Sequence, residues 1–268
     1  MKTILITGST DGIGKQTAYD LAKMGHEIIV HGKDETRGNK IVSEIISSTG
    51  NSKIYYLNAD LSKFADIEAL AENIKLKFPQ LDVLINNAGV FENQKVILEN
   101  GFEKTFMINH LSVFVLTNLL MDVLKSKSNS RIINVSSMAQ ASSIDFKNMN
   151  AEKYYDSYNA YSVSKLANIL FTYKLNSLLE GKNPTVNCLH PGVIGTKLLQ
   201  TGWGMGGGSL SQGAATSVYL ANSDDLNNIS GKYFVSLTER KSVAISYDKK
   251  VQNRLWEISE NIMKTNLQ

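Results

Sequence analysis

Tyr161 and Lys165 stand four residues apart in the run YSVSK, inside a long segment with helical spacing. Side chains four apart on a helix share one face. A free phenol has a pKa of about 10 and is a poor base at neutral pH. An ammonium within ~4 Å, at an effective dielectric of ~20, favours the phenolate by at most ~4 kcal/mol, since the lysine also loses solvation. The pair is therefore a candidate proton donor and acceptor.

The spacing alone is weak support, because Tyr19 and Lys23 repeat it on an earlier helix, where we interpret the pair as ordinary helix surface. Three further features accompany the later pair: a glycine-rich turn at residues 7–14, NNAG at residues 86–89 and Ser136. NNAG and Ser136 each come at the end of an apolar run, and the glycine-rich turn directly follows a third apolar run. In a parallel sheet the carboxyl ends of the strands meet at one edge. We therefore expect these groups to share one site.

The turn at residues 7–14 reads TGSTDGIG and joins the first apolar run to the first helical segment. Glycines there allow a sharp turn and let a diphosphate approach main-chain N–H groups at the helix N-terminus. The spacing differs from GxGxxG, and it is not a phosphate-binding P-loop because Gln16 stands where Ser or Thr would hold magnesium. A plain turn needs about one glycine, so three favour a ligand site.

The choice of nucleotide depends on the stretch after the second apolar run, HGKDETR at residues 31–37. Lys33 and Arg37 favour a ribose 2′-phosphate, hence NADP(H). Asp34 argues for NAD(H), because an acidic side chain about 20 residues past the glycines holds a free 2′-hydroxyl. The alternative interpretation of Asp34, which we prefer, is the N-cap of the next helix.

Short apolar runs alternate with longer helical patterns along the chain. The predicted strands are residues 3–7, 27–30, 53–57, 82–86, 131–135, 185–189 and 232–235. The predicted helices are residues 13–25, 34–48, 62–78, 98–107, 111–127, 158–180, 211–221 and 247–263. Strands without alternating polarity, separated by helices, predict a parallel sheet buried on both faces. We expect an α/β, doubly wound, Rossmann-type parallel sheet of seven strands, with helices on both faces.

Composition sets the broad class. The chain has 268 residues, 43% hydrophobic and 20% charged, which is an ordinary globular balance. The net charge is +3 and the 28 basic residues are dispersed, so we expect no nucleic-acid partner. Cys188 is the single cysteine, which excludes an intramolecular disulfide and a CxxC site and favours an intracellular setting. We expect no metal site and, because no apolar run reaches about 20 residues, no membrane span.

No linker divides the chain, so we predict one domain over residues 1–268. The glycine-rich run GWGMGGG at residues 202–208 is either a flexible surface loop or part of a mobile lid at about 196–210. With the C-terminal segment, 236–268, this lid would close over the substrate. These parts and the 138–159 loop contain several large apolar side chains. They suit an apolar substrate, although simple loop packing explains them equally well.

Jointly and in order, these motifs resemble the short-chain dehydrogenase/reductase family over residues 2–234. The matching runs are TGSTDGIG, NNAG, INHLS, INVSS, YSVSK and HPGVIGT. FMINHLSVFVLTNLL and VNCLHPGVIGTKL are similar to the branch of retinol-dehydrogenase-like and WW-domain-oxidoreductase-like proteins. Lys33 stands where that branch often has arginine, so the charge is kept but bidentate phosphate geometry is lost. Many relatives carry an N-terminal anchor, whereas this chain starts at the first strand, so we expect a soluble, cytoplasmic protein.

The resemblance implies four catalytic residues. Tyr161 would be the general acid in carbonyl reduction and the base in alcohol oxidation, and Lys165 would lower its pKa and hold the nicotinamide ribose. Ser136 would bind the substrate oxygen, and Asn109 would position a relay water; without the family, a strand-end cap and helix support explain these two as well. The implied cofactor-binding residues are Gly8, Ser9, Asp11, Gly12, Ile13, Gly14, Lys33, Asp60, Leu61, Asn87, Gly89, Tyr161, Lys165, Pro191, Gly192, Ile194 and Thr196.

The expected function is interconversion of a small apolar alcohol and its aldehyde or ketone by hydride transfer, with NADP(H) preferred over NAD(H) as cofactor. Two alternatives stay open: an NAD(H)-preferring dehydrogenase, and a nucleotide-binding sensor or scaffold with little turnover. The second is disfavoured because all four catalytic positions are filled. From the resemblance alone, the chain would be a homodimer or a monomer.

Overall fold

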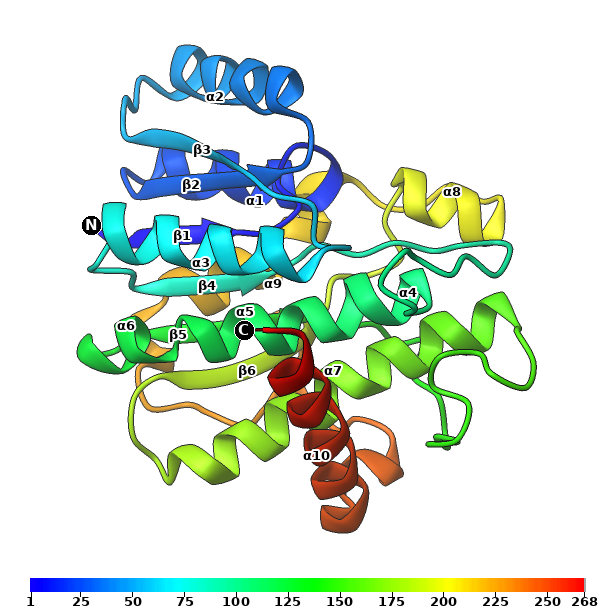
Figure 1. Cartoon of the computed structure of the whole chain (residues 1–268). Helices are drawn as coiled ribbons and strands as arrows, with labels where there is room; N and C mark the ends of the chain where they lie inside the picture. The colour runs from blue at the N-terminus through cyan, green and yellow to red at the C-terminus, as the bar shows by residue number, and fades with distance from the viewer. Residues whose placement is uncertain (268) are drawn as a thin grey trace.

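The strands of the computed structural model, which describes residues 1–267, form one eight-stranded sheet in the order β3-β2-β1-β4-β5-β6-β7-β8 (Figure 1). The strands are β1 Thr3–Ile6, β2 Glu27–Gly32, β3 Ile54–Asn58, β4 Val83–Asn86, β5 Arg131–Val135, β6 Thr185–His190, β7 Tyr233–Val235 and β8 Thr238–Arg240. All neighbours from β3 to β7 are parallel. The order reverses between β1 and β4, which opens a crevice beyond their carboxyl ends.

Helices cover both faces of the sheet. The central strands β1, β4 and β5 are therefore buried along their whole length. The helices are α1 Gly12–Lys23, α2 Glu35–Thr49, α3 Phe64–Lys77, α4 Lys104–Phe106, α5 Ser112–Leu119, α6 Met121–Ser126, α7 Ser157–Leu179, α8 Lys197–Trp203, α9 Leu210–Asn222 and α10 Lys249–Asn266. Apolar side chains of α1, α2 and α9 form the core on one face. Those of α3, α5, α6 and α7 form the core on the other. The doubly wound Rossmann-type fold is confirmed.

The expected seven strands are one too few. After β7 the chain turns at Ser236 and Leu237, which both have positive φ, and β8 returns antiparallel to β7. The three residues of β8, Thr-Glu-Arg, are polar and exposed. They carry neither the apolar run nor the alternation that indicates a strand in sequence.

Two predicted helices also differ. The prediction of a helix over 98–107 is wrong for its first half. There Ile97 and Glu103 form an antiparallel β-bridge across a turn at Gly101, whose φ is +82°. Only Lys104–Phe106 is α-helical there, followed by a π-helix over Met107–Leu111. The helix expected over 111–127 divides at Leu120 into α5 and α6. Glycine turn chemistry and π-helical widening are both hidden from a 3.6-residue apolar pattern.

A chain of buried amide side chains crosses the middle of the sheet. The Nδ2 group of Asn86 on β4 donates to Asn134 Oδ1 on β5 at 2.9 Å and to Thr117 Oγ1 on α5 at 3.0 Å. Asn134 Nδ2 donates in turn to Thr172 Oγ1 on α7 at 2.9 Å. Buried polar groups need such partners. The amides therefore fix how both helices sit against the two central strands.

The C-terminal helix α10 packs against α7 (Figure 1). A buried histidine of the π-helix, His110, contacts both of these helices. His110 Nε2 lies 2.9 Å from Ser259 Oγ on α10, and its Nδ1 lies 3.3 Å from Asn168 Oδ1 on α7. Burial lowers the pKa of His110 to about 4, so its ring is neutral at pH 7. No helix within residues 1–267 has the length and hydropathy needed to cross a membrane.

Acidification is expected to destabilise the protein through this histidine. Its folded pKa is below its unfolded value of 6.5, so the unfolded state binds more protons between pH 6.5 and 4, and stability falls as pH falls through that window. In His110→Gln the fall between pH 6.5 and 4, measured by urea unfolding, should be smaller by up to about 3 kcal/mol. Ser259→Ala is the control: it should lower stability at every pH and keep the full acid dependence. If the stability of His110→Gln fell as steeply between pH 6.5 and 4 as that of wild type, His110 would not be the source of the acid dependence.

Candidate active site

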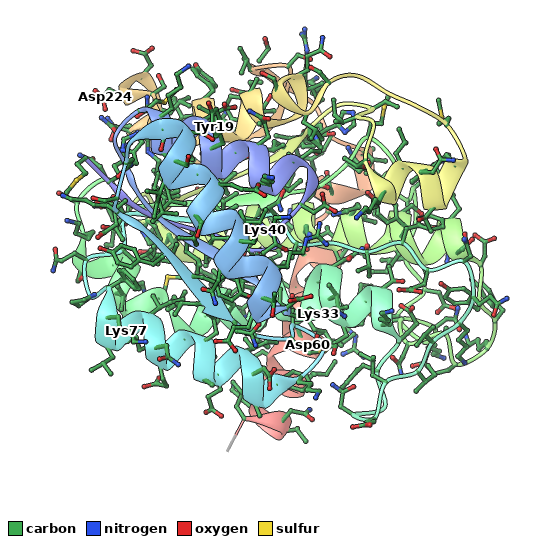
Figure 2. All side chains as sticks on the ribbon, turned by 90° about the horizontal axis from the view of Figure 1, so that it is seen from above. Tyr19, Lys33, Lys40, Asp60, Lys77 and Asp224 are labelled. Atoms are coloured by element: carbon green, nitrogen blue, oxygen red, sulfur yellow. The ribbon has the colours of Figure 1, made fainter. Side chains whose placement is uncertain are left out.

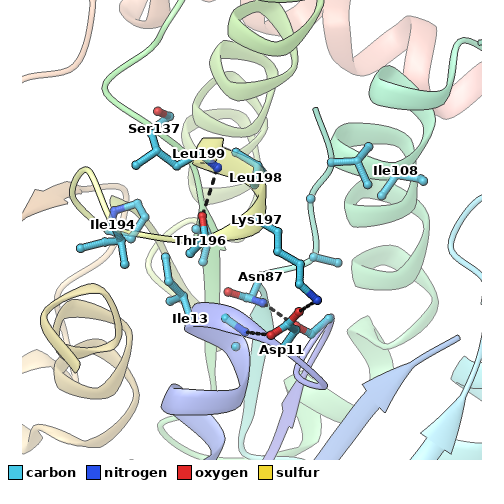
Figure 3. A pocket seen from close by; sticks show the side chains of 18 of the residues that line it. Asp11, Ile13, Asn87, Ile108, Ser137, Ile194, Thr196, Lys197, Leu198 and Leu199 are labelled. Atoms are coloured by element: carbon cyan, nitrogen blue, oxygen red, sulfur yellow. Dashed lines mark hydrogen bonds and ion pairs between the residues drawn. The ribbon is translucent and has the colours of Figure 1, made fainter. Parts of the chain in front are cut away.

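A cavity of about 750 Å³ lies at the carboxyl edge of the sheet. This is the size of many small-molecule sites. Most of the residues proposed from sequence line it. They are Gly8, Asp11, Gly12, Ile13, Gly14, Lys33, Asp60, Leu61, Asn87, Gly89, Ser136, Tyr161, Lys165, Pro191, Gly192, Ile194 and Thr196. Figure 3 shows the part of this wall where α8 approaches the glycine turn. The topology thus brings together groups that are far apart in sequence.

Two glycines of the turn, Gly8 and Gly14, have no room for a side chain. A Cβ on Gly14 would lie 2.4 Å from Asn87 Nδ2, and one on Gly8 would lie 2.8 Å from the Ala88 Cα. Within residues 1–267, the N–H groups of Ile13 and Gly14 in the first turn of α1 have no hydrogen-bond acceptor. Free N–H donors at a helix N-terminus bind anions. The turn therefore fits the diphosphate of a dinucleotide.

Two side chains that sequence analysis did not single out shape this turn. His31 Nδ1 accepts from the Gly8 N–H at 3.1 Å, and burial lowers the pKa of His31 to about 4. Thr7 Oγ1 accepts from the N–H groups of Asn87 and Ala88 at 3.0 and 3.1 Å. A neutral histidine can accept at Nδ1, so the turn depends on that charge state. Only the tertiary arrangement reveals either role.

The residues after β2 place a lysine at the cavity and engage the neighbouring aspartate in a helix cap. Lys33 is exposed, lines the cavity and lies beside Asp60 (Figure 2). Asp34 Oδ1 accepts from the Arg37 N–H at 2.9 Å, so it is the N-cap of α2, as the preferred interpretation expected. Its carboxylate is thereby engaged with its own helix. Tyr19, labelled in Figure 2, lies on α1 well away from this corner.

Tyr161 and Lys165 share one face of α7, but burial dominates their ionisation. Burial raises the pKa of Tyr161 to about 12, against the expected direction, while a hydrogen bond with Ser137 opposes the rise. Burial also lowers the pKa of Lys165 to about 8. Lys165 Nζ donates to the Val135 carbonyl at 3.2 Å and lies 5.5 Å from the centroid of the phenol ring. The helical spacing sets proximity but not the orientation that would stabilise a phenolate.

The two serines after β5 have different surroundings. Ser136 Oγ donates to the Lys165 carbonyl at 2.7 Å, and its residue is 2% exposed. Ser137 instead lies close enough to the Tyr161 phenol to lower its pKa against the effect of burial, and it also lines the cavity. The hydroxyl nearest the phenol therefore belongs to Ser137, whereas Ser136 joins β5 to α7. Both serines line the cavity, and a strand end in sequence does not reveal which of the two lies beside the phenol.

Ser9 and Asn109 lie outside the cavity wall. Ser9 Oγ donates to the Ile6 carbonyl at 2.7 Å and is fully buried. Asn109 Oδ1 accepts from the Val90 N–H at 2.7 Å, and its Nδ2 donates to Ser164 Oγ at 3.0 Å. Both are supporting contacts: the first holds the glycine turn and the second holds the segment after NNAG.

Aromatic side chains cover the phenol on the solvent side. The ring centroid of Trp203, at the end of α8, lies 5.5 Å from that of Tyr161 and 5.1 Å from that of Phe91. Tyr158 lies 6.2 Å from the same indole. This apolar end of the cavity can hold an apolar substrate and exclude water from the phenol. The expected lid at about 196–210 includes Trp203, but its contact with Phe91 could not be foreseen from sequence.

The site therefore has two halves: an anion-binding turn with a neighbouring lysine, and a buried phenol under aromatic rings. A phenol that stays protonated at pH 7 can donate a proton to an oxygen placed beside it. Within residues 1–267, no group of three His, Cys, Asp or Glu side chains is arranged to hold a metal ion. The fold and both halves fit a nicotinamide dinucleotide that exchanges a hydride with a substrate at the apolar end.

Comparisons with known proteins agree with this geometry. A family model described as short chain dehydrogenase matches residues 2–203. The chain is 38% identical to mouse retinol dehydrogenase 14, covering 97% of this chain and 85% of that protein. It is 35% identical to human polyprenol dehydrogenase, over 96% of this chain and 84% of that one.

Solved structures show the same fold. An uncharacterised protein of Mycobacterium paratuberculosis superposes with a TM-score of 0.83 at 29% identity, covering 98% of this chain and 94% of that chain. A short-chain dehydrogenase from Escherichia coli CFT073, solved with NADPH, gives a TM-score of 0.72 at 22% identity, covering 88% and 97%.

The chain belongs to the short-chain dehydrogenase family, in its retinol-dehydrogenase-like branch. It is an NAD(P)-dependent oxidoreductase that acts on CH–OH groups.

Burial of Lys165 predicts a gain in stability when its charge is removed. Its pKa falls from 10.5 to about 8 on folding, so the folded state is penalised below pH 8 and the penalty disappears as pH rises to 10.5. Lys165→Met should be more stable than wild type at pH 7 by up to about 3 kcal/mol, and the gain should shrink towards pH 10. Denaturant unfolding at both pH values measures this. Lys23→Met, on exposed helix surface, should leave the free energy of unfolding unchanged at both pH values. If the stability gain of Lys165→Met were the same at both pH values, the explanation would be wrong.

Proposed function

We propose that this protein interconverts an apolar alcohol and its aldehyde or ketone, with NADP(H) preferred and Tyr161 as the general acid and base. The observation that carries the proposal is the phenol of Tyr161, buried in the cavity wall with Lys165 Nζ 5.5 Å from its ring centroid and Ser137 in the same wall. The hydride is supplied or accepted by the nicotinamide of the bound nucleotide.

In the direction of reduction, Tyr161 would donate its proton to the carbonyl oxygen as negative charge develops there. The high pKa caused by burial keeps the phenol protonated and ready for this role at neutral pH. Lys165 is fixed beneath the ring by its bond to Val135, so its ammonium would stabilise the tyrosinate left after transfer. Burial thus keeps the proton on the phenol in the resting site, and its transfer would depend on Lys165 stabilising the tyrosinate.

Ser137 would hold the substrate oxygen in place of Ser136. Ser137 lines the cavity and lies close enough to Tyr161 to affect the pKa of the phenol, so an oxygen bound between the two would contact both donors. The hydroxyl of Ser136 already donates its hydrogen bond to the Lys165 carbonyl. We assign Asn109 as a positioning residue rather than a relay, because its amide is engaged by Val90 and Ser164.

The substrate end favours an apolar molecule. Phe91, Trp203 and Tyr158 surround the phenol with rings, and Met205 and Leu199 also line this end. Retinol dehydrogenase 14 and polyprenol dehydrogenase are named for apolar alcohols, which supports a similar class here. That residues 196–205 contribute to the cavity wall also supports the lid at about 196–210.

Lys33 supports a preference for NADP(H). Its side chain is exposed at the adenosine end of the cavity and has no ion-pair partner within residues 1–267. An NAD(H) preference is less well supported because Asp34 caps α2. A sensor without turnover is disfavoured by the intact pair of Tyr161 and Lys165. One domain, a cytoplasmic location and a homodimeric or monomeric state stay predictions from sequence.

Replacing Tyr161 by Phe should abolish the proton donor and lower kcat for aldehyde reduction by roughly 10²–10⁴-fold, with little change in NADPH binding. NADPH oxidation with a panel of apolar aldehydes and ketones measures the rate. Ser137→Ala should also lower kcat, whereas Ser136→Ala should mainly lower the melting temperature. Equal turnover by wild type and Tyr161→Phe would rule out the catalytic role.

Lys33→Ala should weaken NADPH binding by roughly 10–100-fold, the loss of one charge-assisted contact, and leave NADH binding unchanged. Quenching of protein fluorescence by each reduced nucleotide gives the two dissociation constants. Lys33→Arg is the control, since it keeps the charge and should keep the preference. If NADH binds wild type more tightly than NADPH, the assignment of Lys33 is wrong.

A further inference from the structure

Asp11 connects three segments at the mouth of the cavity. Its Oδ2 lies 2.6 Å from Arg37 Nη2 on α2 and 2.9 Å from Lys197 Nζ on α8. Its Oδ1 accepts from the Gly12 N–H at 2.9 Å. Partial burial opposes ionisation, but the bonds from Lys197 and Arg37 prevail and lower the pKa of Asp11 to about 2. The carboxylate is therefore charged at any physiological pH.

Helix α8 has few other attachments. None of its residues is buried, and it follows Thr196, whose Oγ1 accepts from the Leu199 N–H at 3.2 Å (Figure 3). It ends at Gly204, with φ +63°, after Trp203 has packed on Phe91. The helix is thus held at its first residue by an ion pair and at its last by aromatic contact.

The ion pair lies over the proposed diphosphate site. Asp11, Gly12, Thr196 and Lys197 all line the same cavity, and Thr196 Cγ2 lies 3.6 Å from the position of a Cβ on Gly12. Figure 3 shows Lys197 reaching from α8 down to Asp11 beside the glycine turn. A nucleotide bound at that turn would have to leave past this contact or wait for it to open.

We infer that Asp11 and Lys197 are positioning residues that latch α8 over the bound nucleotide and slow its release. The inference rests on the proposed function, because it requires a nicotinamide dinucleotide at the glycine turn. It also changes the role expected of Asp11: its carboxylate holds the lid, rather than contacting an anionic cofactor that it would repel. Lys197 is largely exposed, so the latch is weak enough to open in each turnover.

The alternative is that Lys197 contacts the nucleotide phosphates directly, and a double-mutant cycle separates the two. The dissociation rate of NADPH is measured by stopped-flow fluorescence after mixing with excess NADP⁺, for wild type, Lys197→Gln, Asp11→Asn and the double variant. The latch predicts that Lys197→Gln speeds release by about two- to five-fold in wild type and has no effect in the Asp11→Asn background. Lys250→Gln, on α10, should change nothing.

Salt provides a second readout. Raising the ionic strength to 1 M, where the Debye length is about 3 Å, should bring the wild-type rate towards that of Lys197→Gln. An equal effect of Lys197→Gln in both backgrounds, or no effect in either, would overturn the latch while leaving nucleotide binding intact. Absence of NADPH and NADH binding by wild type would instead overturn the proposed function, and the latch with it.

Discussion

The burial of Lys165 beneath the cavity is the constraint on which the remaining geometry depends. Its ammonium is bonded to the Val135 carbonyl at the end of β5, and its own carbonyl accepts from Ser136 of the same segment. This reciprocal pair of bonds joins α7 to the sheet at the height of the cavity. Tyr161 and Ser137 are consequently held at a fixed separation, and a cation is kept in a place that would otherwise favour an apolar side chain.

The same cavity has different physical demands at its two ends. The glycine turn and its free N–H groups need solvent-facing cations nearby, because a dinucleotide brings several negative charges. The phenol end needs the opposite, a dry environment in which proton transfer competes with little water. Helix α8 spans both ends, with a charged residue at its start and an indole at its end. One short helix therefore covers both, although each is built on different strands.

Sequence analysis located the site because its signals are local: the glycine turn, the lysine at the end of β2 and the N-cap Asp34 each follow from short-range geometry. It named Ser136, whereas we propose Ser137, and it expected a lowered pKa for Tyr161, whereas burial raises that pKa. Both points depend on side-chain orientation and burial. The strand β8 and the turn at Gly101 were missed because exposed polar strands and reversed turns leave no apolar pattern. His31 and Asn168 act only through contacts distant in sequence.

The crossing amides of Asn86 and Asn134 limit how this core can change over time. Asn86 Nδ2 donates to Asn134 Oδ1, so an apolar replacement of either residue removes a buried hydrogen bond from the other, which keeps only its bond to Thr117 or Thr172. An all-apolar layer could be as stable, but reaching it needs at least two coordinated changes through a destabilised intermediate. Sequence drift at these positions should therefore be epistatic, with both amides retained or both lost together.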